Sequence, residues 1–173
     1  MTIAVDVRDL LHQPGASRQV AVCESIDGLA TELVRVPQDR PIRAELVLES
    51  LVEGILATGH VSGTEVLWCA RCLKPTETPF GVEVHELFAP NATPEDDEYP
   101  ITEGTIDLEP LIRDAVLLMV PFAPLCTPQC LGLCERCGGD RNLGECSCGP
   151  EPDARWEALA TLRFPDSERD RDM

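Results

Sequence analysis

Polar and apolar residues alternate with a period of two along much of residues 42–88, as in strands with one buried face. Ala44, Leu46 and Leu48 are separated by Glu45 and Val47, and similar runs cover residues 55–61 and 80–86. A Ser-Gly pair at residues 62–63 is a turn signal between two such runs. Short strands joined by short turns predict an antiparallel β meander or a partly closed barrel.

A helical pattern follows these strands. Its apolar positions, spaced three or four residues apart, are Leu108, Leu111, Ile112, Ala115 and Met119. Asp107 can cap the start of this helix and Pro121 ends it. We expect a long helix that packs its apolar stripe on the sheet, which makes the fold class α+β. A short C-terminal helix is expected over residues 150–165, followed by a disordered tail over 166–173.

The length of 173 residues suits one core domain with a small appendage. We place the α+β core at residues 1–125, with an acidic loop near 89–105, and a cysteine-rich segment packed on the core at 126–149. Residues 83–109 contain nine acids and no Lys or Arg. The four consecutive acids of this loop are the candidate partner-binding residues Glu95, Asp96, Asp97 and Glu98.

The formal net charge of −17 restricts the classes of partner. Nucleic-acid binding through a general basic surface is excluded, because phosphate contacts need Lys and Arg. Such a chain should prefer basic partners, although acidic charge can also serve solubility alone. No apolar run is long enough to span a bilayer, and the N-terminus has no secretory leader, so we expect a cytoplasmic protein without a membrane partner.

The chain has nine cysteines, and without a leader they indicate metal binding rather than disulfides. Eight of them form four close pairs, namely Cys69 with Cys72, Cys126 with Cys130, Cys134 with Cys137, and Cys146 with Cys148. Zinc prefers a tetrahedron of ligands, and each close pair supplies two corners. About two zinc ions are expected, both structural, because four thiolates leave no open coordination position. The ninth, Cys23, is expected to be a buried apolar residue.

The four pairs can combine in two ways. In the combination we prefer, the last two pairs form a local site that closes over a few residues. Cys69 and Cys72 then join Cys126 and Cys130, which staples a turn between strands to the segment after the helix. In the rival combination, Cys126 and Cys130 share an ion with Cys134 and Cys137.

Several of these motifs occur together in a known family. They are Cys69-Ala-Arg-Cys72-Leu, Leu111-Ile112-Arg113-Asp114, Cys126-x₃-Cys130-x-Gly132-Leu133-Cys134-x₂-Cys137-Gly138, Asn142-Leu143 and Cys146-x-Cys148. In order and spacing, over roughly residues 40–165, the chain resembles the YceD family, described as large ribosomal RNA subunit accumulation proteins.

The resemblance implies a role in accumulation of the large-subunit (23S) rRNA, and hence in ribosome biogenesis. Genes of this family commonly neighbour that of a small, basic large-subunit protein. Some relatives keep the first cysteine pair and a His/Cys pair near Cys126 and Cys130 but lack the later cluster, which supports the preferred combination.

The sequence contains no catalytic motif that we recognise, and we expect no enzyme. The leading hypothesis is a ribosome biogenesis factor that binds a basic large-subunit ribosomal protein or a pre-ribosomal particle. One alternative is a redox-sensitive zinc chaperone, because C-x-C with C-x₂-C also occurs in zinc-gated heat-shock chaperones. Another is an RNA-binding zinc module that uses the bases beside the cysteines, which are Arg71, Lys74, Arg136 and Arg141. We favour the interpretation that these bases only offset thiolate charge.

Overall fold

The computed structural model describes residues 2–93, 97–149, 155 and 159. The chain divides into two compact units, Met1–Gly132 and Leu133–Met173. The boundary between the units falls inside the segment 126–149 that the sequence analysis treated as one piece. The helix expected over 150–165 and the tail expected over 166–173 fall outside the described residues, apart from Arg155 and Leu159.

The first unit contains all the strands and the α-helix of the described chain. In chain order these are β1 (Ala4–Asp6), β2 (Ser17–Glu24), β3 (Val34–Arg35), β4 (Ile42–Ser50), β5 (Ile55–Trp68), β6 (Pro75–Ala89), β7 (Tyr99–Thr102), β8 (Thr105–Asp107) and α1 (Leu108–Met119). Among the described residues, no helix is long and apolar enough to cross a membrane.

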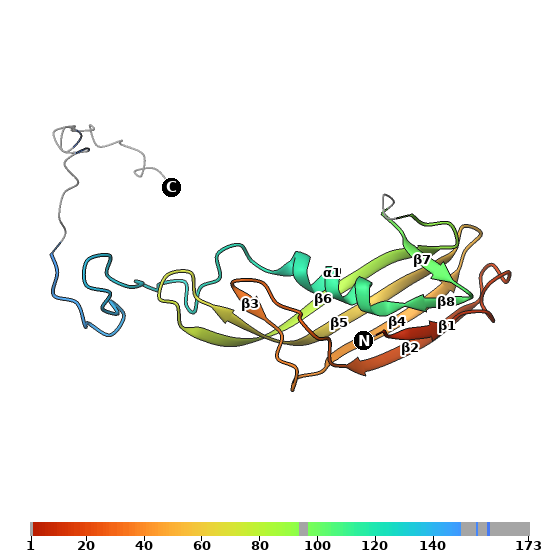
Figure 1. Cartoon of the computed structure of the whole chain (residues 1–173), viewed down its shortest axis with the longest axis horizontal. Helices are drawn as coiled ribbons and strands as arrows, with labels where there is room; N and C mark the ends of the chain where they lie inside the picture. The colour runs from red at the N-terminus through yellow and green to blue at the C-terminus, as the bar shows by residue number, and fades with distance from the viewer. Residues whose placement is uncertain (1, 94–96, 150–154, 156–158, 160–173) are drawn as a thin grey trace, which may run out of the picture. The chain divides into compact units, whose positions relative to one another are not determined.

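The strands form one curled sheet in the order β1-β8-β7-β6-β5-β4-β2, with β3 beside β5 (Figure 1). The expected meander is present in β4, β5 and β6, which pair antiparallel in sequence order. The turn expected at residues 62–63 is wrong, because both residues lie within β5 and pair with β6. β6 and β7, however, pair in parallel, so the sheet is mixed rather than purely antiparallel. Two neighbouring strands that run in the same direction cannot be joined by a hairpin turn. The result is a half-barrel with one helix.

The hairpin of β5 and β6 is the longest element of the sheet. Its register runs without interruption from the pair of Ile55 with Phe88 to the pair of Trp68 with Pro75. Gly59 lies within it at φ +151°, where an added Cβ would come within 2.1 Å of the Glu45 carbonyl oxygen. A side chain is therefore excluded where β4 crosses close to β5.

One position in this hairpin breaks the expected alternation. Glu65 on β5 is buried, and its Oε2 has no hydrogen-bond partner within the described chain. Burial raises the pKa of this carboxyl group, because the charged form loses its hydration.

α1 packs its apolar stripe on β5 and β6, as expected (Figure 1). Leu111, Ile112 and Val116 are buried there. The expectation of a long helix is wrong, because α1 has only 12 residues. Val120 leaves helical geometry at ψ 125°, which is the conformation that a following proline imposes. Pro121 therefore ends α1 at an ordinary length for a globular protein.

Asp107 should contribute measurably to stability, because one oxygen serves two backbone groups. Its Oδ1 accepts the Glu109 N–H at 3.0 Å, which caps α1, and the Ile3 N–H at 3.0 Å, which holds the segment before β1. Asp107→Ala should lower the free energy of unfolding by about 1–2 kcal/mol. Asp107→Asn keeps an acceptor and should retain most of that stability in urea denaturation. Equal losses in the two variants would contradict this role.

Candidate metal centres and acidic surface

The structure brings the eight paired cysteines into two groups of four. The core cluster, in the first unit, consists of Cys69, Cys72, Cys126 and Cys130. The local cluster, in the second unit, consists of Cys134, Cys137, Cys146 and Cys148. Within each group all four sulfurs lie within 4.8 Å of one another. This grouping corresponds to the preferred combination of pairs and not to the rival one.

The core cluster takes its first two cysteines, Cys69 and Cys72, from the tip of the β5–β6 hairpin. The Cys69 N–H donates to the Lys74 carbonyl at 3.0 Å, and the Leu73 N–H donates to the Cys69 carbonyl at 2.9 Å. These bonds close a tight turn that turns both cysteines inward, where they are buried. The Ala70 N–H donates to the Pro124 carbonyl at 2.8 Å, which brings the segment after α1 to the hairpin tip.

Arg71 also binds the segment after α1, at Cys130. Its Nη1 donates to the Cys130 carbonyl at 2.8 Å. Gly132 has φ +74°, and a Cβ there would come within 3.0 Å of the Arg71 carbonyl oxygen. The absence of a side chain therefore permits the close approach of the two segments. Arg71, a candidate RNA contact by sequence, is instead bound to the backbone of the core cluster.

The sulfur positions test whether the core cluster suits a metal ion. A tetrahedral ion with sulfurs about 2.3 Å away would hold those sulfurs about 3.8 Å apart. The Cys69 and Cys130 sulfurs are separated by 3.8 Å, and those of Cys72 and Cys126 by 3.6 Å. Four thiolates at this spacing fit one tetrahedral ion with no position left open.

The surroundings of the core cluster lower the pKa of one thiol, Cys69, and raise the pKa of two others, Cys72 and Cys126. Burial opposes ionisation of Cys69, but backbone N–H groups of Cys126, Cys72 and Arg71 overcome it and lower its pKa to about 6. Hydrogen bonds with the Cys72 and Cys130 side chains, together with burial, raise the pKa of Cys126 to about 12. Crowded thiolates repel one another, and a bound cation would remove that repulsion.

The local cluster is built by turns within a short stretch of chain. The Cys134 N–H donates to the Gly139 carbonyl and the Gly138 N–H to the Cys134 carbonyl, both at 2.8 Å. Gly138 has φ +71°, which glycine adopts without strain, so the turn closes directly after Cys137. In the second pair, the Cys148 N–H donates to the Cys146 sulfur at 3.4 Å.

In the local cluster, too, one thiol has a lowered pKa and two thiols, those of Cys146 and Cys148, have raised pKa values. Backbone N–H groups of Cys137 and Arg136 lower the pKa of Cys134 to about 6. Hydrogen bonds with the Cys137 and Cys146 side chains raise the pKa of Cys148 to about 12. Both clusters are therefore chemically similar sites for a cation.

Asp140 is a structural residue of the local cluster that the sequence analysis missed. It is buried, and its Oδ1 accepts the backbone N–H and the side-chain amide of Asn142, both at 2.8 Å. Its carbonyl accepts the Glu145 N–H at 3.2 Å. These bonds shape the turn between the two cysteine pairs. The signal in the sequence was an Asp two residues before Asn, which is typical of an Asx turn.

Cys23 belongs to neither cluster. The expectation that it would be buried is wrong, because it lies exposed on β2. Its position on this strand places its side chain on the outer face of the sheet, whereas Val20 and Val22 are partly buried.

Two of the four candidate partner-binding acids line a hollow in the first unit. Glu95 and Asp96 lie outside the described residues, whereas Asp97 and Glu98 are described and exposed. The hollow, of about 550 Å³, is lined by Glu86, Asp97, Glu98, Tyr99, Asp114, Leu117 and Leu118. We call it the acidic hollow. It contains four carboxylates and no Lys or Arg among its lining residues.

The acidic hollow combines residues from three parts of the chain. Glu86 comes from β6 and Asp114 from α1, while Tyr99 on β7 donates its hydroxyl to Asp114 Oδ2 at 2.9 Å. Burial and the Asp114 carboxylate both raise the pKa of Tyr99, which keeps this hydroxyl a donor. At the rim, Leu118 is 87% exposed. The meeting of Glu86 and Asp114 with the loop acids could not be predicted from the sequence, because α1 and β6 become neighbours only in the folded sheet.

A family model matches more than half of this chain. The model of a family described as large ribosomal RNA subunit accumulation protein YceD matches residues 57–163. The match begins within β5 and includes both cysteine clusters and the acidic hollow. No solved structure matches this chain.

Individual relatives extend the match toward the N-terminus. An uncharacterized protein of Mycobacterium tuberculosis is 35% identical over 96% of this chain and 84% of its own length. The uncharacterized protein YlbN of Bacillus subtilis is 30% identical over 62% of this chain and 66% of its own length. The large ribosomal RNA subunit accumulation protein YCED homolog 1, chloroplastic, of Arabidopsis thaliana is 35% identical over 38% of this chain and 21% of its own.

The two clusters predict the metal content of the protein. Protein purified under reducing conditions without chelators should contain about two metal ions per chain, because eight thiolates form two sites of four. Elemental analysis for zinc, iron, cobalt and nickel measures this content. A value near zero would show that the thiolates do not hold metal. A value near one would show that only one of the two clusters binds a metal ion.

The two clusters should also differ in their effect on folding. Cys134→Ser should lose one ion and leave the sheet's thermal melt nearly unchanged, because the local cluster lies in the second unit. Cys69→Ser should lower that melt strongly, since the core cluster ties the hairpin to the segment after α1, and zinc-linked folding energy is on the order of 10 kcal/mol. Cys23→Ser, outside both clusters, is the control. Equal damage from the two cluster variants would contradict the assignment.

Proposed function

This chain belongs to the YceD family, and on that premise we propose that it is a non-enzymatic ribosome biogenesis factor supporting large-subunit (23S) rRNA accumulation. We propose further that it acts by binding a basic ribosomal protein of the large subunit, alone or within a pre-ribosomal particle. The family description supports the ribosomal role. The acidic hollow is the observation that supports a basic protein as the partner.

The acidic hollow suits a cationic side chain in both charge and shape. Its four carboxylates come from different elements but line one cavity, and the Tyr99 hydroxyl is already engaged with Asp114. Glu86 is half-buried, so an ammonium or guanidinium group beside it would meet less solvent screening than on an open surface. Leu118 at the rim can contact the aliphatic stem of a Lys or Arg side chain.

Naked rRNA is a poorer partner for this surface. Carboxylates repel phosphates, and the chain as a whole carries a formal charge of −17. Among the bases beside the cysteines, Arg71 is bound to the Cys130 carbonyl. The influence on rRNA would then be exerted through a ribosomal protein that stabilises the rRNA.

We also propose that both cysteine clusters hold zinc. Thiolates are soft ligands, and a tetrahedral set of four suits zinc or iron–sulfur chemistry. The spacing in the core cluster suits a single ion. With four protein ligands, each zinc ion would have a structural role, holding the turns that surround it.

Removing charge from the acidic hollow should slow binding to basic ribosomal proteins. The variant Glu86→Gln/Asp97→Asn/Glu98→Gln should lower the association rate constant by about tenfold at low salt, with a smaller change in dissociation, because such charges mainly steer encounter. Raising the salt concentration should reduce the difference between variant and wild type. The measurement is surface plasmon resonance with individually purified large-subunit proteins at two salt concentrations.

A matched control separates the position of the charge from its amount. The variant Glu32→Gln/Glu49→Gln/Glu53→Gln removes the same charge from exposed positions outside the acidic hollow and should bind nearly as wild type does. An equal loss of binding in the two variants would show that the acidic hollow is not the binding site. Tight binding to rRNA fragments alone, lost when the bases at 71, 74, 136 and 141 are replaced, would replace the proposed partner with RNA.

A further inference from the structure

The sheet of the first unit has two free edges. β1 and β2 end the strand order, and in the described chain each pairs on one side only, β1 with β8 and β2 with β4. The longer edge belongs to β2, whose eight residues all pair with β4 in an uninterrupted register. An edge strand of this length exposes unpaired backbone groups that can bind another strand.

The direction of these backbone groups follows from the start of β2. The Ser50 N–H donates to the Ala16 carbonyl at 2.8 Å, in register with the pair of Ser17 and Glu49. Backbone groups of alternate residues in an antiparallel pair point to the same side, so even-numbered residues of β2 bond to β4. Gln19, Ala21 and Cys23 therefore direct their N–H and carbonyl groups to the open side, where the described chain provides no backbone partner.

Nothing in the described chain blocks this edge near its C-terminal end. A hollow of about 360 Å³ separates β1 from Val20, Ala21, Val22 and Glu24 of β2. The strand contains no Pro and no bulge, two devices that commonly protect an edge from pairing, and its charged residues are confined to Arg18 and Glu24 near its two ends. Its outward side chains at Ser17, Gln19, Ala21 and Cys23 are small or uncharged.

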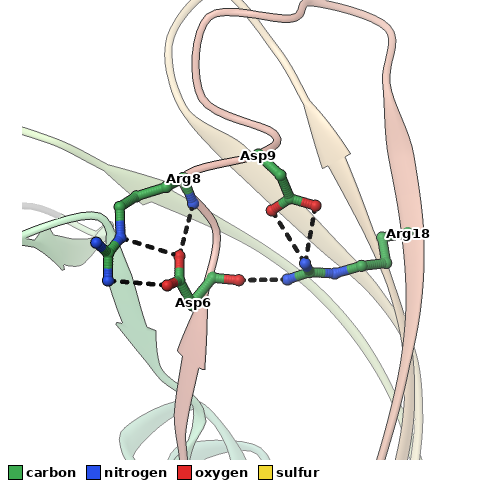
Figure 2. A network of polar contacts seen from close by, with 4 residues as sticks. All are labelled: Asp6, Arg8, Asp9 and Arg18. Atoms are coloured by element: carbon green, nitrogen blue, oxygen red, sulfur yellow. Dashed lines mark hydrogen bonds and ion pairs between the residues drawn. The ribbon is translucent and has the colours of Figure 1, made fainter.

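Near the N-terminal end of β2, the Arg18 side chain connects β2 to β1, where no backbone pairing joins the two strands. Arg18 Nη1 binds both carboxylate oxygens of Asp9, and its Nη2 donates to the Asp6 carbonyl at the end of β1 (Figure 2). This carbonyl is thus satisfied by a guanidinium rather than by a backbone N–H of β2. The Nε–H of Arg18 makes no hydrogen bond to the described part of the chain, so it remains available to a further acceptor.

From this edge we infer that β2 pairs antiparallel with β2 of a second copy of the chain, around a twofold axis at Ala21. In that register Val20 lies opposite the partner's Val22, and Arg18 lies opposite the partner's Glu24, on the partly buried face. Neighbouring registers place Arg18 opposite an apolar residue instead. The pairing forms about six backbone hydrogen bonds and joins the two sheets into one. It does not depend on the proposed function.

The oligomeric state of the full-length protein tests this inference. Sedimentation equilibrium from about 1 to 300 µM should show the mass rising from 18.9 kDa toward twice that value, because a single strand pair makes a small, weak interface. Ala21→Pro removes an outward N–H without touching the β2–β4 ladder, and it should weaken the dimer by at least about tenfold. Ala21→Thr keeps the N–H and should dimerise as wild type does.

Cross-linking tests the register itself. Gln19→Cys lies opposite the partner's Cys23, at a Cα separation of about 5.5 Å that a disulfide can bridge, so glutathione oxidation should yield a covalent dimer. Ser17→Cys reaches the partner's Cys23 only in the neighbouring register and should remain uncross-linked. A wild-type protein that stays monomeric at 300 µM would overturn the inference, and so would a dimer that Ala21→Pro leaves intact or an equal yield from the two cysteine variants.

Discussion

The continuous pairing of β5 with β6 is the constraint on which the other features of the first unit depend. This hairpin carries Cys69 and Cys72 at its tip, so its register decides where half of the core cluster is presented. Its body is the platform for α1, which in turn brings Asp114 to the acidic hollow beside Glu86 of β6. A slip of one residue would turn every side chain to the other face and would displace both sites together.

The features that could be predicted from the sequence are those determined by residues close to one another along the chain. Alternation identified the strands around Leu46 and Val84, and Asp107 and Pro121 marked the ends of the helix because capping and termination are local effects. The close cysteine pairs indicated metal ligands for the same reason, since each pair occupies one turn. The expected helix was nevertheless longer than α1. A stripe of apolar residues predicts which face of a helix is buried more reliably than it predicts the length of the helix.

Features that depend on distant segments were not predictable in this way. The parallel pairing of β6 with β7 joins strands separated by a loop of acids, and alternation carries no information about strand direction. Glu65 is buried on the core face of β5, where its charge predicts exposure. The acidic hollow likewise needs α1, β6 and β7 to meet. Its loop acids were visible in the sequence, but the carboxylates opposite them were not.

The spacing of the cysteines has a consequence for biosynthesis. A chain made from its N-terminus exposes Cys69 and Cys72 well before Cys126, which lies 54 residues after Cys72. β6, β7, β8 and α1 are all synthesised in that interval. Four sulfurs can therefore surround an ion at the core cluster only after these elements have been synthesised, so a metal ion bound there would be captured late. At the local cluster all four cysteines lie between residues 134 and 148, so folding there and the binding of an ion could occur together.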